Sequence, residues 1–152
     1  MQEKVIKNKT YLHCLYDLDE ENPEGDFLVD NVDFAFKLNK ETLKPSGYFE
    51  TLAKRLYCVL NPKNSSLFFA CTVSQSLLAY DKKKDFKLFF ESQTRRESWC
   101  LETLNDEYMF AVGQSEGRIC FYEASRRKAK FRERHSLQAF GTSSVWCITR
   151  LD

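Results

Sequence analysis

The chain has 152 residues, of which 43% are hydrophobic and 30% charged, a composition typical of a folded protein rather than a disordered one. Its 23 Lys and Arg residues nearly balance its 22 Asp and Glu residues, so no overall charge attracts it to nucleic acid or to a membrane surface. It has neither a run of about 20 apolar residues nor the apolar core of a signal peptide. We therefore expect one domain, residues 1–152, in the cytoplasm or nucleus, with no membrane partner.

The first group of predicted strands lies within residues 11–52. Apolar runs between turn signals place these strands at Tyr11–Leu18, Phe27–Asp30, Val32–Leu38 and Tyr48–Thr51, with an acidic turn after the first and a break at Pro45-Ser46-Gly47 before the last. The acidic turn does not match a calcium loop, because Asn22 stands where an EF-hand needs Gly and Leu28 where it needs Glu. We interpret it as a solvated turn.

Two further groups follow the same plan. Residues 53–95 predict strands at Arg55–Leu60, Leu67–Val73, Leu77–Tyr80 and Phe86–Glu91. Residues 96–141 predict strands at Ser98–Thr103, Tyr108–Val112 and Arg118–Tyr122, and a weaker one within Phe131–Phe140. A turn at Gly113–Gly117 offers Gly at positions expected to need positive φ.

Four of the six cysteines share one context, in which an aromatic or imidazole ring precedes the Cys and an aliphatic residue follows it. They are spaced by 44, 42 and 47 residues, and an aromatic residue follows each of the first three after 22 residues. A period of this length is typical of repeat proteins. The structural repeat positions are thus Cys14, Phe36, Cys58, Tyr80, Cys100, Tyr122 and Cys147.

Several segments resemble the WD-repeat family of β-propellers. Phe140–Ile148 resembles the family's Gly-His segment before an inner strand, Tyr80-Asp81 and Tyr122-Glu123 resemble its Trp-Asp dipeptide, and Gly113–Gly117 resembles its turn between the second and third strands. Thr142 replaces the family's His, and Glu116 replaces its turn Asp. The resemblance implies an all-β partial propeller of about three four-stranded blades, with the first strand of a further unit in residues 142–152.

Metal and thiol chemistry have little support in the cysteine spacing. No two cysteines lie within four residues of each other, and only two histidines are present, so a zinc or redox motif is not predicted, although a site built from distant residues stays open. Cys58 follows Lys54 and Arg55, yet such cations do not recur at the other positions. We favour packing thiols over reactive ones, and we predict no catalytic residue, metal or cofactor.

One segment concentrates positive charge, with six basic residues in nine positions. It can contact a phosphate backbone or act as a nuclear import signal, but Lys and Arg also protect an exposed edge strand from aggregation, which is the interpretation we favour. The residues of this possible interaction patch are Arg126, Arg127, Lys128, Lys130, Arg132 and Arg134.

These observations predict a non-enzymatic scaffold that binds protein partners. Repeat units bury their faces against neighbours, so about three blades leave apolar surface open. The chain is then a fragment of a longer propeller, a subunit completed by another chain, or a half-propeller that self-associates. The alternative is an RNA or ribonucleoprotein-binding module that uses Arg126 to Arg134.

Overall fold

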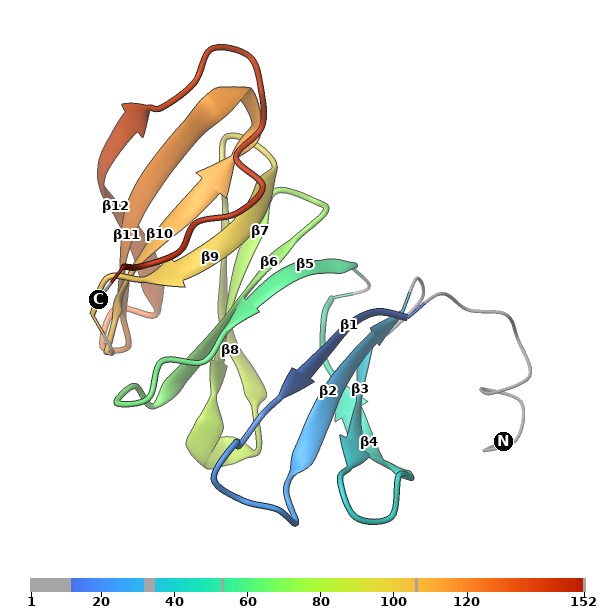
Figure 1. Cartoon of the computed structure of the whole chain (residues 1–152). Helices are drawn as coiled ribbons and strands as arrows, with labels where there is room; N and C mark the ends of the chain where they lie inside the picture. Colours follow the sequence, from blue (N-terminus) through green and yellow to red (C-terminus); the bar gives the residue numbers. More distant parts are fainter. Residues whose placement is uncertain (1–11, 32–34, 53, 106, 152) are drawn as a thin grey trace. The chain divides into compact units, whose positions relative to one another are not determined.

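A computed structural model of the chain describes residues 12–31, 35–52, 54–105 and 107–151, with the side chains of residues 12–14 and 31 excepted. The chain divides into two compact units, residues 1–55 and 56–152. The first unit holds one four-stranded sheet and the second holds two (Figure 1). All pairings are antiparallel between strands consecutive in sequence, which confirms the all-β prediction.

The first sheet is an antiparallel meander. It consists of β1 (Leu12–Asp17), β2 (Asp26–Asn31), β3 (Ala35–Asn39) and β4 (Pro45–Phe49). The predicted break at Pro45-Ser46-Gly47 is wrong, because these residues form most of β4. Proline is tolerated there since it is the first residue of an edge strand. Tyr11 and Val32, where two strands were expected to begin, lie outside the described residues.

The acidic turn between β1 and β2 surrounds a lysine. The Lys40 ammonium lies 2.5 Å from Asp17 Oδ1 and donates to the carbonyl oxygens of Asp19 and Asn22. Its charge also lies 5.6 Å from the centre of the Phe27 ring. The turn is therefore organised around the ammonium group of Lys40.

The second unit contains two sheets and two single turns of 3-10 helix. The second sheet comprises β5 (Leu56–Leu60), β6 (Leu67–Thr72), β7 (Ser76–Asp81) and β8 (Lys87–Gln93), with η1 at Lys82–Lys84. The third comprises β9 (Ser98–Thr103), β10 (Met109–Gln114), β11 (Arg118–Ser125) and β12 (Lys130–Gln138), with η2 at Ser115–Gly117. The eight strands lie where the apolar runs predicted them, with bounds that differ by a few residues.

A shared aromatic core joins the second and third sheets. Phe69 of β6 stacks on Phe110 of β10 with ring centres 4.8 Å apart, and Phe131 of β12 contacts both of these rings and Phe90 of β8. Leucine, valine, alanine, cysteine and tyrosine side chains complete the cluster. Removing one such ring typically costs about 3–5 kcal/mol of folding free energy, so this core dominates the stability of the second unit.

The ring residue of each of the first three ring-Cys pairs is a β-bulge. The register passes from Leu12 to Cys14, from Leu56 to Cys58 and from Ser98 to Cys100, and each time it skips the residue between. A bulged residue has no partner opposite it and increases the local twist of the strand. The sequence landmark therefore marks the same irregularity in the first strand of all three sheets.

A second irregularity recurs where the third strand meets the fourth. The pairing skips Ser46 in β4, Phe89 in β8 and Arg134 in β12.

This register corrects one predicted repeat position. In the second and third sheets the repeat aromatic stands opposite a phenylalanine of the preceding strand, Tyr80 opposite Phe68 and Tyr122 opposite Phe110. The phenylalanine at the same place in the first sheet is Phe27, and it stands opposite Leu38 and not Phe36. The constant spacing of 22 residues fails in the first sheet because its first turn is longer.

The segment after β12 returns along β9, as the dark red chain in Figure 1 shows. The strand expected there is not formed. Val145 donates one backbone hydrogen bond to Gln114 O at 3.0 Å, and residues 144–151 adopt no regular structure. Side chains hold the segment instead, because Val145 is buried and Trp146 lies against Trp99 with ring centres 4.4 Å apart.

Two glycines of the β10–β11 region serve different purposes. Gly117 has φ of +69°, as the turn prediction required, and Glu116 before it also has positive φ. Gly113 does not have positive φ and belongs to β10, so the prediction was wrong for it. A Cβ at Gly113 would lie 2.4 Å from Cys100 Sγ and 2.7 Å from Val145 O, so this position requires glycine for space.

Gly113→Ala is expected to destabilise the second unit by about 1–3 kcal/mol, because the added methyl must displace Cys100 or the segment at Val145. Gly141→Ala is the matched control, since a Cβ there meets nothing within 4 Å, and it should change stability by less than about 0.5 kcal/mol. Urea unfolding of the two variants measures the difference. Equal midpoints would show that neither Cys100 nor the segment at Val145 approaches Gly113 this closely.

Candidate interaction surface

The basic segment forms the hairpin that joins β11 to β12. The turn at residues 126–129 is closed by hydrogen bonds from Lys128 N to Ser125 Oγ and from Ala129 N to Arg126 O, both 3.3 Å long. β12 is the outermost strand of its sheet, and within the described part of the chain it pairs with β11 alone. The structure thus places these residues on an exposed turn and an edge strand.

Strand alternation separates the side chains of β12. Phe131 points into the aromatic core, so Lys130 and Arg132 on either side of it point to the opposite face, where both are exposed. A hollow of about 430 Å³ opens beside them. It is lined by Glu123, Ser125, Arg127, Lys128, Lys130, Phe131 and Arg132.

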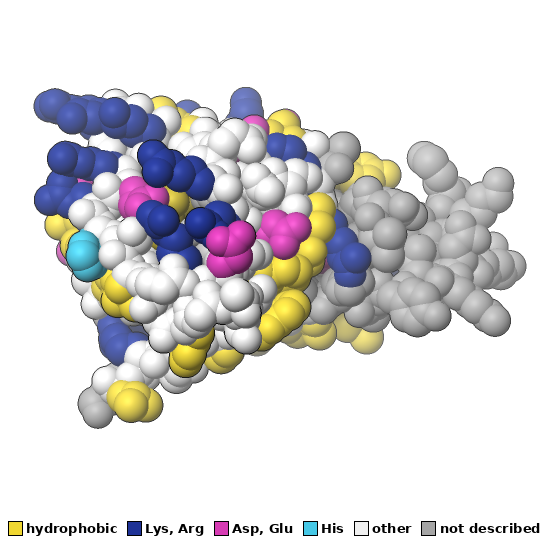
Figure 2. Space-filling view, turned by 90° about the horizontal axis from the view of Figure 1, so that it is seen from above, with side chains coloured by type: hydrophobic (Ala, Val, Ile, Leu, Met, Phe, Trp, Pro, Cys, Tyr) yellow, Lys and Arg dark blue, Asp and Glu magenta, His cyan; other side chains and the backbone are white. Residues whose placement is uncertain are grey.

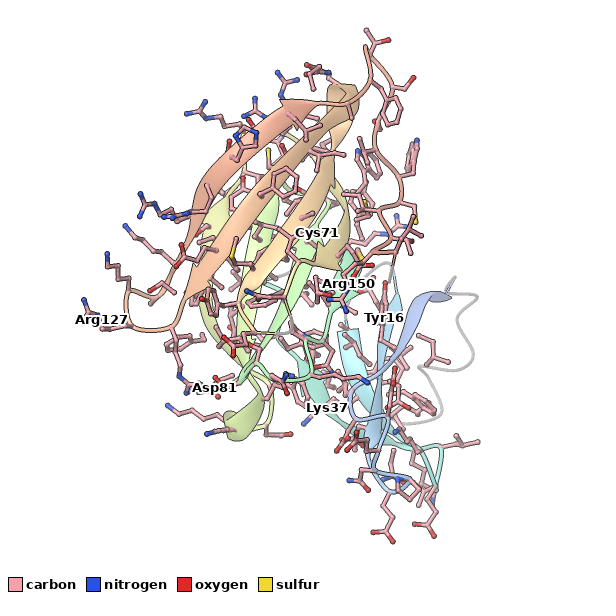
Figure 3. All side chains as sticks on the ribbon, turned by 60° about the vertical axis from the view of Figure 1, so that its left-hand side comes forward. Tyr16, Lys37, Cys71, Asp81, Arg127 and Arg150 are labelled. Atoms are coloured by element: carbon pink, nitrogen blue, oxygen red, sulfur yellow. The ribbon has the colours of Figure 1, made fainter. Side chains whose placement is uncertain are left out.

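The hollow is strongly cationic. Four of its lining residues are positive and one is negative. Figure 2 shows Lys and Arg side chains gathered on one side of the face it views, with few acidic ones among them. Figure 3 shows Arg127 at the hairpin turn, pointing away from the strands. The nearly neutral chain therefore carries a local positive surface, which we call the basic hollow.

Arg126 does not belong to the basic hollow. Its guanidinium lies 2.5 Å from Asp81 Oδ2 and 2.6 Å from Ser66 Oγ, and it also lies over the Phe89 ring. The Asp81 side chain is 1% exposed, and its other oxygen accepts the backbone N–H of Lys83 at the start of η1. Arg126 thus joins the third sheet to the second and neutralises a buried carboxylate.

Arg134 is also separated from the rest of the predicted patch. It is the bulged residue of β12, and its guanidinium lies 3.5 Å from Glu123 Oε2. The structure therefore brings together Arg127, Lys128, Lys130 and Arg132 and assigns Arg126 and Arg134 to ion pairs.

A polar network of the third sheet, buried at Gln114 and exposed at Glu133, was not predicted. Gln114, 2% exposed, donates to Ser98 Oγ at 3.2 Å and accepts from Cys120 Sγ at 3.1 Å. Arg118 then donates to the Cys120 sulfur and to Glu133, and Glu133 also accepts from Tyr122 Oη. The one sequence signal for this network is that Gln114 and Ser98 fall at the ends of two strands that pair with each other.

Three cysteines of the second unit, Cys71, Cys100 and Cys120, are buried packing groups. Burial raises the pKa of Cys100 to about 11 and raises the pKa of Cys71 well above its ordinary value. Cys58 of β5 stands opposite Cys71 of β6 in the strand register, and both are free thiols, whereas Cys147 is exposed in the final segment. Cys14 lies in β1, and its side chain is outside the described part of the chain. A raised pKa keeps a thiol protonated and unreactive, which opposes a role as a nucleophile.

The aromatic repeat positions of the second unit also lie inside. Tyr80 is fully buried in β7, and Tyr122 is nearly so in β11, where burial raises the pKa of its phenol. Among the residues that the structure describes, no three His, Cys, Asp or Glu side chains cluster closely enough to hold a metal ion.

Comparison with known proteins finds a solved structure of similar fold but assigns no family. No family model and no curated protein matches the sequence. Among solved structures, the chain resembles the crystal structure of the computationally designed Ika8 protein, with a TM-score of 0.64 and 10% identity over 87% of this chain. The chain spans 38% of the length of that protein. The described residues also include no helix with the length and apolarity needed to cross a membrane.

Iodoacetamide should modify Cys147 of the native protein at pH 8 much faster than Cys71 or Cys100. Exposure decides this order, because both buried thiols are shielded and stay protonated at that pH. Mass spectrometry of timed digests gives the three rates, and unfolding in urea should equalise them. Rapid native alkylation of Cys100 would contradict its assignment as a packing group.

Arg126→Ala should lower the free energy of unfolding by about 1–3 kcal/mol, because it leaves the buried Asp81 carboxylate without its cation. The loss stays below that of a fully buried pair, since the Arg126 side chain is 43% exposed. Arg127→Ala, in the same turn, should change stability by less than about 0.5 kcal/mol.

A double-mutant cycle with Asp81→Asn isolates the Arg126–Asp81 interaction. Asparagine keeps an oxygen that can accept the Lys83 N–H, so the substitution removes the charge of Asp81 and keeps its hydrogen bond to the start of η1. Additive effects of the two substitutions in urea unfolding would show that the ion pair contributes nothing.

Proposed function

We propose that the chain is part of a WD-repeat-like propeller and acts as a non-enzymatic scaffold for protein partners. Each of its three sheets is one blade in this proposal. The support is a repeated plan: four consecutive antiparallel strands, a bulge at the ring-Cys position of the first strand, and a second bulge in the fourth strand. Separate folds joined by chance have no reason to share both irregularities.

One observation carries the proposal furthest, the row of rings in the second unit. Tyr57 stacks on Trp99, and Trp99 contacts Trp146, with both pairs of ring centres 4.4 Å apart. These three residues precede Cys58, Cys100 and Cys147, so ring-Cys positions of successive repeats lie side by side. In this proposal Trp146 stands for the first strand of a further blade, although no strand forms there.

The exposed end of this row supports the proposal that further structure attaches there. Trp146 is 66% exposed and Cys147 is exposed, whereas Trp99 is partly covered on both sides by its neighbours in the row. Further blades, from this polypeptide or another chain, would cover Trp146 and close the propeller. Because repeat proteins bury apolar faces only against neighbours, such a surface suits assembly better than catalysis.

The alternative is RNA or ribonucleoprotein binding, and the observation that favours it is the basic hollow. Four cations beside one carboxylate can contact a phosphate backbone. Arg126 and Arg134 are occupied by ion pairs, so an RNA surface would consist of the other four basic residues.

Covalent capture tests the scaffold function. A photoreactive phenylalanine analogue replaces Trp146 in the full chain, or Tyr48 as the control, which is also highly exposed but lies in the first unit. Position 146 should yield a defined protein adduct that resists nuclease, and the purified partner should then form a complex of fixed stoichiometry with the native chain by light scattering. Trp146→Ser should weaken that complex and Tyr48→Ser should not. Adducts to RNA alone, or no complex with purified protein, would reject the proposal.

A further inference from the structure

The β12 edge combines an open strand edge with a concentrated positive surface. It is a nine-residue strand at the end of the third sheet, so its outer side pairs with no other strand of that sheet. It also borders the basic hollow, where Lys130 and Arg132 project from the same face of the strand. An unpaired strand edge accepts an added strand, and positive side chains along it select which strand can approach.

The spacing of the cations suits an extended acidic peptide. Lys130 and Arg132 are two residues apart on one strand, so their side chains repeat at about 6.8 Å, as do alternate side chains of any paired strand. Arg127 and Lys128 add positive charge at the hairpin end of the hollow. Glu123 is the single acid of the lining, and its carboxylate lies 3.5 Å from the Arg134 guanidinium, which offsets its repulsion.

The same surface lacks what single-stranded nucleic acid requires. Base recognition without sequence preference relies on exposed aromatic rings for stacking. Phe131 is the one ring that lines the basic hollow, and it is 9% exposed and packed against Phe69, Phe90 and Phe110. The backbone edge of β12, in contrast, offers hydrogen bonds that only another polypeptide strand can match.

We propose that the basic hollow binds an extended acidic peptide segment, which adds to β12 as a further strand. The pairing runs along Lys130–Glu133, because the bulge at Arg134 interrupts the regular edge beyond that point. Alternate Asp or Glu residues of the peptide pair with Lys130 and Arg132, and Arg127 and Lys128 attract its acidic flank. The proposal rests on the scaffold function and names the chemistry of one partner.

The probe is a fluorescein-labelled peptide of alternating Glu and Thr, about eight residues long, which is enough to pair along an ordinary strand. Fluorescence anisotropy with the full chain should show binding that weakens as salt increases. Lys130→Glu/Arg132→Glu should weaken it by about tenfold or more, because two attractions become repulsions. Lys83→Glu/Lys84→Glu, an equal charge change at exposed residues of η1, is the matched control and should bind as the native chain does.

Two further probes separate strand addition from simple charge attraction. The same peptide with alternate backbone nitrogens methylated keeps its charges but cannot complete the strand pairing, so it should bind much more weakly. An oligouridine of about ten nucleotides offers phosphate without a polypeptide edge and should bind more weakly than the Glu-Thr peptide.

Several outcomes would overturn the proposal. They are equal loss of binding in the control variant, undiminished binding of the methylated peptide, or preference for oligouridine. Because Lys130 and Arg132 are exposed, their reversal should leave the thermal unfolding midpoint unchanged. If it does not, Arg127→Glu/Lys128→Glu in the exposed turn takes its place, and undiminished peptide binding by that variant would also reject the proposal. The capture at position 146 is measured separately, so a failed peptide assay leaves the scaffold function standing.

Discussion

The aromatic contact between the second and third sheets determines which side chains β12 presents to solvent. Phe131 is fixed by Phe69, Phe90 and Phe110, and its inward position forces Lys130 and Arg132 outward. The basic hollow is therefore a consequence of core packing and not an independent feature of a flexible tail. Arg126 strengthens the same junction from its rim, where its guanidinium compensates the charge of buried Asp81. A substitution in the core would therefore shift the surface side chains, because β12 carries both Phe131 and the cations beside it.

The sequence predicted the strands well because each is a short apolar run between turn signals, which is local information. It predicted the basic segment as a turn and edge strand for the same reason. It could not divide that segment, because the partner that removes Arg126 from the patch, Asp81, lies 45 residues away and meets it only when two sheets pack. The fixed spacing also misplaced Phe36, since a constant count ignores an acidic turn that is longer in the first sheet and is organised around Lys40.

The bulges explain why a ring and a thiol recur together. A bulge adds a residue to one strand, and the added residue has no partner opposite it. Tyr57 and Trp99 use this freedom to stack on each other and so connect neighbouring sheets through a row of rings. A strictly alternating strand would offer its side chains only to its two faces, so the irregularity is what makes this row available.

In the second unit a small residue follows the bulges of β5 and β9, and cysteine is small while remaining apolar. Cys58 stands opposite Cys71, and Cys100 stands opposite Gly113, so both members of each pair are compact. The gap they leave admits the following segment closely enough for the Cys100 thiol to donate to Val145 O at 3.5 Å. A leucine at position 100 would fill the space that Val145 now occupies and would separate Trp146 from Trp99. Cys100 is therefore the small residue that lets the final segment approach the third sheet, and its chemistry as a thiol is incidental to that role.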